Sequence, residues 1–541
     1  MNGSNGYWRG PDDGPRLYIL LVVAAVLGLG LLSAGCGIDF NNPPRLATAT
    51  ARAATPEAPQ SEPLVLPAPT STAASGQSGA GDVTNVTGAE ATPLSEGDGL
   101  TIWVDETSAE HKAVLDDLAS EFADQYGTNV AVQLVSTALL PELVSTGVLS
   151  GTLPDLILHP IEYTAGWAEE GILDAAAADE IIDRLGRDTF DPSALELMSV
   201  DGQVAALPSD GYRQLLLYRA DWFEEMNLAV PDNFNAMATA AERIFNPEAI
   251  ISGLVIPTES NLVTTHQAFE QIALANGCRL INDAGEVLIL EPECATALDH
   301  YFTTINRYSP SGVQTDTSAV IAFLTGRTGI IMTSPAILPD LAGLDEGALP
   351  SCSECTATDG GINYLAPNTG IVTDIRGPDG APTSFGNIRS LGITSAADRT
   401  PAQTFAEFWF NEGYERWLAV DSERKVPMRL GTESEPRRFI DAWGTLPLGE
   451  SYLSLVDIYG EEIVGRLRDG IAAAPRWGIR EGYGGLMTQI YDDHLISIVL
   501  QEMLSGYFDA TTTLREAYRR TIELIPNYAF PDRLAGEVGE N

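Results

Sequence analysis

The sequence predicts an α/β fold, because short apolar segments alternate with amphipathic segments from about residue 99 onwards. Residues 109–126 place apolar side chains at helical spacing, as Val114, Leu118 and Phe122 illustrate. Three flanking runs are apolar and rich in β-branched residues, which favours strands: Leu100–Val104, Asn129–Val135 and Pro154–Leu158. This strand–helix–strand rhythm predicts a parallel sheet covered by helices on both faces.

The elements that follow continue this alternation and then become helical. Further extended segments are expected at Val204–Pro208, Leu215–Tyr218, Gly253–Pro257 and Gly329–Thr333. Helices are expected near Tyr163–Glu170, Ala220–Met226, Asn235–Phe245 and Leu262–Asn276. Past Pro401 the periodicity is mostly helical, at Ala402–Asn411, Tyr414–Val420, Ser451–Leu467, Leu486–Leu504 and Thr513–Leu524. The last part of the chain is therefore expected to be rich in helices.

Composition describes a large, acidic, globular protein. The 541 residues exceed one ordinary core and suggest two or three domains. Hydrophobic residues make up 44% of the chain and charged residues 19%, which is typical of a folded protein. The 75 acidic and 30 basic residues give a formal net charge of -45. A surface of this sign repels phosphate backbones, which excludes nucleic-acid binding as a main role.

The N-terminus is expected to carry an export signal. An apolar run, Leu17–Cys36, follows Arg9 and Arg16 and ends on small residues, as in a secretory signal peptide. Its exit, Leu32–Cys36, resembles a bacterial lipobox, in which the cysteine is lipidated and begins the mature chain. Residues 1–36 are thus expected to be a lipoprotein signal peptide. The alternative is an uncleaved transmembrane anchor, and either reading tethers the rest of the chain outside the cytoplasm.

Residues 37–98 are expected to be a disordered stalk. They are rich in Pro, Ala, Thr, Ser and Gly, and cannot bury enough apolar surface to offset the entropy of ordering. The folded part would then occupy residues 99–541.

Four cysteines remain after Cys36, and an even number in an exported chain favours disulfides. Sequence proximity suggests Cys278 with Cys294 and Cys352 with Cys355, one of three possible connectivities. A redox or zinc motif is the alternative for the last pair. With no second Cys-x-x-Cys and no paired histidine beside it, a structural disulfide is favoured.

Several segments, in order, resemble one known family. They are Leu100–Asp105, Gly151–Leu158 with Glu170–Asp174, Val200–Pro208, Leu217–Phe223, Ala322–Met332, and Phe405–Leu418 followed by Val426–Met428. Together they cover about residues 100–528 and resemble the extracellular solute-binding proteins of ABC importers, of the maltose or sugar type (family 1). The resemblance implies a two-lobe type II periplasmic-binding-protein clamp. Lobe one would comprise about 99–207 and 328–380, and lobe two about 208–327 and 381–541.

The resemblance also implies a ligand site between the lobes. Ligands in open α/β sheets bind beyond the carboxyl ends of the strands, here at Asp105–Ser108 and His159–Tyr163. By order along the chain, the family's pocket loops fall on Glu106, Thr107, His159, Glu162, Tyr163, Asp210, Tyr212, Ser334, Phe385 and Asn387, and Trp477 is a late-chain stacking candidate. Glu106 could instead be solvated at a helix N-terminus, and His159 could be a satisfied core residue. No metal site with ligand spacing, cofactor motif or catalytic residue is expected.

The function implied is capture of a small solute, sugar or oligosaccharide, by hinge closure and its delivery to a membrane permease. The tryptophan usual after the family's return strand is replaced by Ser334-Pro335-Ala336, which leaves oligosaccharide, polyol, glycerol phosphate or another solute open. The protein is expected to be a monomer. Alternatives are a sensor or adhesion module on the same fold and, less favoured, an exported glycoside hydrolase. A hydrolase is less favoured because no Gly-x-Ser-x-Gly or His-Glu-x-x-His motif is present.

Overall fold

The computed structural model describes residues 99–357, 363–449 and 451–530. The expected signal peptide with Cys36, and the expected stalk, lie outside these residues. Across the described residues, none of the helices combines the length and the apolar character needed to cross a bilayer.

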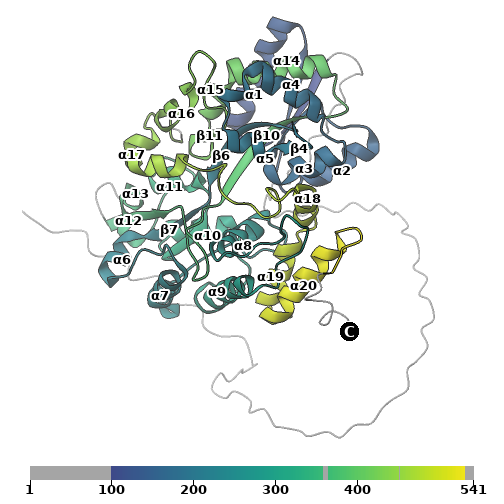
Figure 1. Cartoon of the computed structure of the whole chain (residues 1–541). Coiled ribbons are helices and arrows are strands. Elements are labelled where there is room, and N and C mark those ends of the chain that lie inside the picture. The colour runs from purple at the N-terminus through teal and green to yellow at the C-terminus, as the bar shows by residue number, and fades with distance from the viewer. Residues whose placement is uncertain (1–98, 358–362, 450, 531–541) are drawn as a thin grey trace, which may run out of the picture. The chain divides into compact units, whose positions relative to one another are not determined.

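The first lobe is built on a six-stranded sheet of order β11-β6-β10-β3-β1-β2 (Figure 1). Three of its strands are parallel, as the sequence predicts: β1 (Gly99–Asp105), β2 (Asn129–Val135) and β3 (Leu156–Pro160). Helix α1 (Ala109–Tyr126) connects β1 to β2; the Ser108 side chain caps it, and it ends at Gly127 with a φ of 75°. Helix α2 (Leu140–Ser150) connects β2 to β3.

The other half of this sheet is antiparallel and comes from distant parts of the chain. It consists of β6 (Leu207–Arg213), β10 (Gly386–Ile393) and β11 (Val426–Pro427). Helices α14 (Arg399–Phe408) and α15 (Tyr414–Leu418) pack beside it, separated by a single π-helical turn. Their aromatic residues are buried in the core of this lobe, as their helical spacing predicts: Phe408, Trp409, Phe410 and Trp417.

The second lobe contains a three-stranded antiparallel sheet of order β8-β7-β9. Its strands are β7 (Leu215–Arg219), β8 (Ile330–Thr333) and β9 (Thr369–Val372). The principal helices around it are α6 (Ala220–Met226), α7 (Phe234–Ile244), α8 (Val263–Ala275), α9 (Pro292–Tyr308) and α10 (Asp316–Leu324). The expected strand at residues 253–257 forms isolated bridges to the β8 segment, as at Val255 with Ile331, and no continuous strand.

Shorter elements complete both lobes. They are α3 (Ile161–Glu169), α4 (Ala175–Leu185), α5 (Pro192–Leu197), β4 (Ser199–Val200), β5 (Gln203–Val204), α11 (Leu338–Leu341), α12 (Ser353–Ala357), α13 (Leu365–Asn368) and α16 (Arg438–Ala442).

The lobe boundaries drawn from the sequence are wrong in two segments. Residues 328–380 were expected in the first lobe, but β8 and β9 pair with β7 of the second. Residues 386–427 were expected in the second lobe, but β10 and β11 lie in the first sheet, as does β6. An apolar run predicts a strand, whereas its partner is decided by contacts distant in sequence, so the segments were assigned to the wrong sheets.

The C-terminal helices connect the two lobes. They are α17 (Leu455–Arg468), α18 (Gly484–Asp492), α19 (Leu495–Leu504) and α20 (Ala510–Glu523). Helix α18 packs against α3 of the first lobe, while α19 and α20 pack against α8 and α9 of the second (Figure 1). We call α18 and α19 the C-terminal strap.

The contact between the strap and α3 is close. The Thr488 hydroxyl donates to the Glu162 carbonyl (2.6 Å) and accepts from the Gly166 amide (3.1 Å). A Cβ at Gly166 would lie 2.5 Å from Thr488, so glycine is what permits this approach.

The four described cysteines form the two disulfides that sequence proximity suggests. Cys278 is bonded to Cys294, and Cys352 to Cys355. All four side chains are buried, which fits a structural role for both bonds.

Candidate ligand-binding cleft

Two adjoining cavities of about 610 Å³ each open near the crossing between the lobes. The polar cavity is lined by Asp105, Glu106, Thr107, Ser136, Thr137, Ala138, Pro141, Glu142, Pro160, Glu162, Tyr163, Tyr212, Asn261, Leu262, Val263, Thr264, Gln267, Asp316, Asn387, Arg389, Arg424, Tyr491, Asp492 and His494. The apolar cavity is lined mainly by α10, the end of β8 and the segment that follows it. Tyr212, Thr264, Gln267 and Asp316 border both cavities.

The polar cavity lies at the carboxyl ends of β1 and β3, where the topology of an open sheet favours ligand sites. Its opposite wall comes from the start of α8, in the second lobe. Residues of both lobes therefore line one cavity, as a clamp requires.

Arg389 is the central charge of the polar cavity. It stands opposite Asp210 in the register of β10 and β6, and donates from Nε (3.1 Å) and Nη2 (2.8 Å) to Asp210 Oδ1. Its Nη1 also forms an ion pair with Glu106. Asp210 is completely buried, and its other oxygen accepts from Trp417 Nε1 (2.8 Å). Arg389 is thus held rigidly by two carboxylates.

Glu106 is engaged on both oxygens. Arg424 Nη2 lies 3.3 Å from Oε2, while Arg389 holds Oε1. Burial alone would raise the pKa of Glu106, but these two guanidinium groups hold it well below its ordinary value. Glu106 therefore lines the cavity as an ionised carboxylate that orients arginines, and has little capacity left for a ligand.

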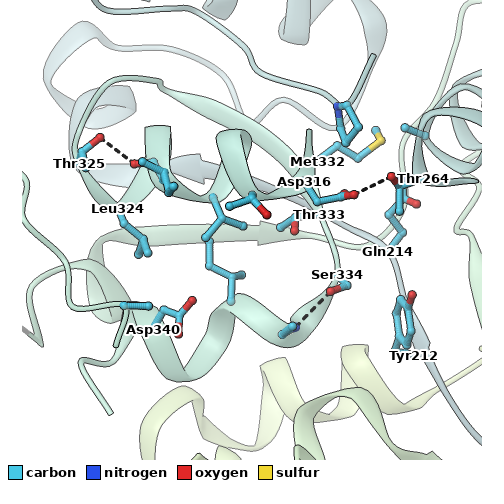
Figure 2. A pocket seen from close by; sticks show the side chains of 18 of the residues that line it. Tyr212, Gln214, Thr264, Asp316, Leu324, Thr325, Met332, Thr333, Ser334 and Asp340 are labelled. Carbon is cyan, nitrogen blue, oxygen red and sulfur yellow. Dashed lines mark hydrogen bonds between the residues drawn. The ribbon is translucent and has the colours of Figure 1, made fainter. Parts of the chain in front are cut away.

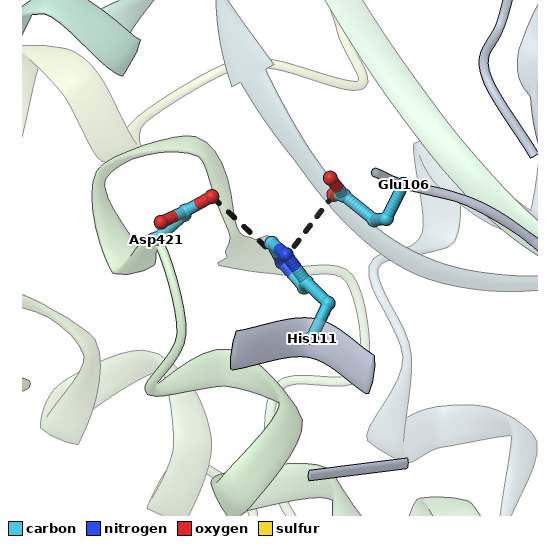
Figure 3. A group of neighbouring side chains, drawn as sticks. All are labelled: Glu106, His111 and Asp421. Atoms are coloured by element: carbon cyan, nitrogen blue, oxygen red, sulfur yellow. Dashed lines mark ion pairs between the residues drawn. The ribbon is translucent and has the colours of Figure 1, made fainter. Parts of the chain in front are cut away.

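Behind Glu106 lies a cluster with the composition of a metal site (Figure 3). Its members are Glu106, His111 and Asp421, whose potential ligand atoms lie within 4.8 Å of one another. Two basic side chains already lie at this position: Lys425 Nζ is 2.7 Å from His111 Nε2, and Arg424 donates to Asp421 (2.7 Å). Burial and Lys425 lower the pKa of His111 to about 4, so the imidazole is neutral. We assign these residues to a charge network that supports Arg389 and Glu106.

Three buried polar atoms at the cavities have no hydrogen-bond partner among the described residues: Glu162 Oε2, Asn387 Oδ1 and Gln214 Nε2. Another hydrogen bond orients the side chains of Glu162 and Asn387, and Gln214 lies at the crossing from β6 to β7. Gln267 Nε2 donates to Glu162 Oε1 (3.0 Å), and Asn387 Nδ2 donates to the Tyr212 hydroxyl (3.2 Å). These atoms comprise two acceptors and one donor, and of the acceptors Glu162 Oε2 also lies 3.8 Å from Arg476 Nη2.

Three other acidic groups that line the cavities, Asp105, Glu162 and Asp316, are held toward their neutral forms. Burial raises the pKa of Asp105 to about 6, against a hydrogen bond from Thr137 and the charge of Arg389. Burial also raises the pKa of Glu162 and of Asp316. A protonated carboxyl can donate as well as accept a hydrogen bond, as a hydroxyl does.

A second buried network lies behind the polar cavity and involves the strap. Arg476 bonds Glu270 of α8 (3.3 Å), the Gly386 carbonyl of β10 (3.2 Å) and the Tyr491 hydroxyl of α18 (3.0 Å). Its Nη2 is 3.8 Å from Glu162 Oε2. This single guanidinium therefore contacts both lobes and the strap.

Seven of the eleven expected ligand contacts line the cavities. Glu106, Thr107, Glu162, Tyr163, Tyr212 and Asn387 border the polar cavity, and Ser334 borders the apolar one. The other four, His159, Asp210, Phe385 and Trp477, lie outside the walls of both cavities and are buried.

Each of these four has a structural partner that explains its burial. His159 packs on Trp167 with Nδ1 bonded to the Pro160 carbonyl (3.0 Å), and Asp210 is committed to Arg389. Phe385 lies 4.3 Å beneath the Arg476 guanidinium. Trp477, expected as a stacking ring, is a core residue whose Nε1 donates to the Cys278 carbonyl (3.0 Å).

Residues that sequence reasoning missed include both arginines of the polar cavity and the amides Gln214 and Gln267. Arg389 lies in a stretch for which no strand is predicted from the sequence, and its position opposite Asp210 follows only from the pairing of β10 with β6. Gln214 is at the crossing from β6 to β7, and only the turn between the lobes places it at a cavity.

The chain was compared with known proteins. Residues 117–435, more than half of its length, match the family model described as "Bacterial extracellular solute-binding protein". The "Putative ABC transporter periplasmic-binding protein YcjN" of Escherichia coli is 25% identical over 436 residues, covering 77% of this chain and 91% of the relative.

Solved structures agree on the fold. "Maltose bound T. maritima MalE3" superposes with a TM-score of 0.61 at 17% identity, covering 79% of this chain and all of that one. A solute-binding protein of Agrobacterium vitis with bound D-mannitol gives a TM-score of 0.57 at 16% identity, covering 79% and 98%. The two-lobe type II clamp is confirmed, and this chain belongs to the family of bacterial extracellular solute-binding proteins of ABC transporters.

Proposed function

We propose that this protein binds a neutral, polyhydroxylated solute, a sugar or a polyol, in the polar cavity and delivers it to an ABC permease. The observation that carries the proposal is the set of buried polar atoms without a partner among the described residues: Glu162 Oε2, Asn387 Oδ1 and Gln214 Nε2. Unsatisfied buried polar atoms are costly, so they favour an occupant that supplies the missing bonds. Glu162 and Asn387 line the polar cavity, and Gln214 lines the adjoining apolar cavity. A hydroxyl group both donates and accepts, so a polyol in the polar cavity can satisfy the two atoms that lie there.

The charge of the cavity argues against an anionic solute. Its two arginines are committed to Glu106, Asp210 and Asp421, so neither is free to bind a phosphate or carboxylate. The chain as a whole is strongly acidic. A cationic solute is disfavoured as well, because several lining carboxyl groups have raised pKa values.

Relatives support the same class of ligand. A mannitol-binding protein of Pseudomonas aeruginosa is 25% identical over 190 residues, covering 34% of this chain and 42% of that protein. Two structural neighbours hold maltose and D-mannitol. These likenesses support the proposal that the cavity binds a solute with several hydroxyl groups.

The test is a thermal-shift screen of the full chain in lipid nanodiscs against sugars, alditols, amino acids and inorganic phosphate. A ligand that binds the folded state raises the melting temperature by mass action. We expect a shift with one sugar or alditol class. A shift with phosphate or amino acids alone would contradict the proposal.

Variants tie the binding to the named atoms. Asn387→Ala and Gln214→Ala should each weaken binding about five- to tenfold, the worth of about 1 kcal/mol per hydrogen bond. Gln125→Ala, on the exposed face of α1, is the matched control and should leave affinity unchanged.

The proposal includes a lipid tether at Cys36, with residues 37–98 as the stalk. Mass spectrometry of the mature N-terminus should find a diacylglyceryl cysteine, and Cys36→Ser should abolish both lipidation and processing. A mature chain that retains residues before 36 would favour the uncleaved anchor instead.

A further inference from the structure

The apolar cavity has walls unlike those of a sugar site. Six large aliphatic side chains of α10, β8 and the segment after it line this cavity: Val320, Ile321, Leu324, Met332, Ile337 and Leu349. Ile321 is 55% exposed and Leu349 43% exposed, although both line a cavity. Large aliphatic groups left open in a concave site mark a place for apolar material.

Several polar groups of this cavity are already occupied by neighbours, and Gln214 Nε2, which has no partner within the described part of the chain, lies at the end near Tyr212. Thr325 donates to the Ile321 carbonyl (2.7 Å), Thr264 donates to Asp316 (2.6 Å), and Ser334 accepts from the Ala336 amide (3.4 Å), as Figure 2 shows. A row of sugar hydroxyls here would lose hydrogen bonds to water and gain few in return.

Aromatic stacking is also scarce in the apolar cavity. Among its described lining residues, Tyr212 is the one aromatic ring, and it stands at the edge shared with the polar cavity. Flat sugar faces bind to aromatic rings, so a second or third sugar unit would find no platform on the aliphatic wall.

The two cavities adjoin and share part of their walls. In Figure 2, Tyr212, Gln214, Thr264 and Asp316 gather at one end of the apolar cavity, while Leu324 lies toward the other. Three of the four residues at that shared end, Tyr212, Thr264 and Asp316, also line the polar cavity. One ligand can therefore extend from the polar cavity along the aliphatic wall.

We propose that the ligand is amphipathic, with a polyhydroxylated head in the polar cavity and an alkyl or acyl substituent in the apolar cavity. This inference rests on the proposed function, since the head is the sugar or polyol argued for above. The aliphatic wall selects the substituent, and Glu162 Oε2 and Asn387 Oδ1 in the polar cavity select the head.

The test compares paired probes on the full chain in nanodiscs, with empty nanodiscs subtracted. Methyl and hexyl glycosides of glucose, mannose, galactose and maltose are measured by isothermal titration beside the free sugars and alditols. Each buried methylene tightens binding about threefold to fourfold. Five added methylenes, partly buried, should make at least one hexyl glycoside more than tenfold tighter than its methyl partner.

Ile321→Asn places an amide on the aliphatic wall at an exposed position, where the fold should tolerate it. It should lower the hexyl-to-methyl affinity ratio at least threefold and leave methyl glycoside binding unchanged. Leu149→Asn, at a 90% exposed position on α2, is the matched control and should change neither.

The outcomes separate the two proposals. The amphipathic ligand is refuted, and the sugar or polyol site stands, if sugars or alditols bind but hexyl and methyl glycosides bind with equal affinity. The same holds if the affinity rises more from maltose to maltotriose than from a methyl to a hexyl glycoside. A hexyl gain that survives Ile321→Asn also refutes it, because the substituent then lies elsewhere. If no sugar, alditol or glycoside binds, the proposed function itself fails.

Discussion

Replacement of Arg389 by methionine tests the charge network that shapes the polar cavity. Arg389→Met keeps the approximate length of the side chain and removes its charge and all its donors. Asp210 would lose both bonds to Oδ1 while remaining completely buried, and Glu106 would keep Arg424 alone. The variant therefore leaves a buried carboxylate without its counterion.

The expected cost follows from this geometry. Breaking a buried ion pair by removing one partner costs about 3–5 kcal/mol. The Arg389 side chain is 8% exposed, so solvent screens the pair little. Arg424→Met is the control: its side chain is 22% exposed and Glu106 keeps Arg389, so we expect a loss of about 1 kcal/mol.

Equilibrium unfolding in urea, followed by tryptophan fluorescence, measures both variants. Because the cost comes from the stranded charge, adding Asp210→Asn to Arg389→Met should recover at least about 1 kcal/mol of the loss. A loss below about 1 kcal/mol in Arg389→Met, or further destabilisation in the double variant, would refute the reasoning.

Three further predictions concern other parts of the molecule. Burial and Asp421 raise the pKa of Glu423 from an ordinary 4.5 to about 8. The neutral carboxyl group therefore makes its full contribution to the free energy of unfolding below pH 4.5. This contribution is lost as the pH rises to 8, at up to about 1.4 kcal/mol per pH unit. Glu423→Gln should flatten this dependence, measured as unfolding free energies at pH 5 and pH 9; parallel profiles would count against it. Replacing Cys278 and Cys294 by serine opens a link across 16 residues and should cost about 3 kcal/mol, measured as a lower Tm. The shorter disulfide should cost less, and equal losses would contradict the loop-length argument. Thr488→Val removes both hydrogen bonds to α3 and should lower the free energy of unfolding in urea by about 1–3 kcal/mol. Thr488→Ser keeps the hydroxyl group and should change it little. Equal losses in the two variants would show that the hydroxyl group is unimportant.

Local elements of this fold were predictable because their physical causes are local. The strands β1, β2 and β3 are apolar runs, and α1 has a cap, a periodic apolar face and a terminal glycine within its own sequence. The lobe assignments of β8 and β10 failed because nothing within either run states which distant strand it will join. That choice depends on packing across more than a hundred residues.

The position of the polar cavity was predictable to the extent that backbone topology alone decides it. The loop after β1 and the loop after β3 meet at one edge of a parallel sheet, and both line the polar cavity. Trp477 failed because a ring in a glycine-rich stretch reads as exposed, while its burial depends on the Cys278 carbonyl, almost two hundred residues away. Arg389 was missed because its partner, Asp210, stands opposite it only once β10 and β6 are paired.

The way distant segments complete each sheet sets the order in which this chain can fold. The first sheet lacks its centre until β10, near residue 390, has been made, and the second lacks an edge until β9, near residue 370. The strap, which covers α3 and α8, is finished only at residue 504. Contacts this far apart in sequence make folding slow. Neither lobe can therefore complete its native contacts before the strap has been synthesised.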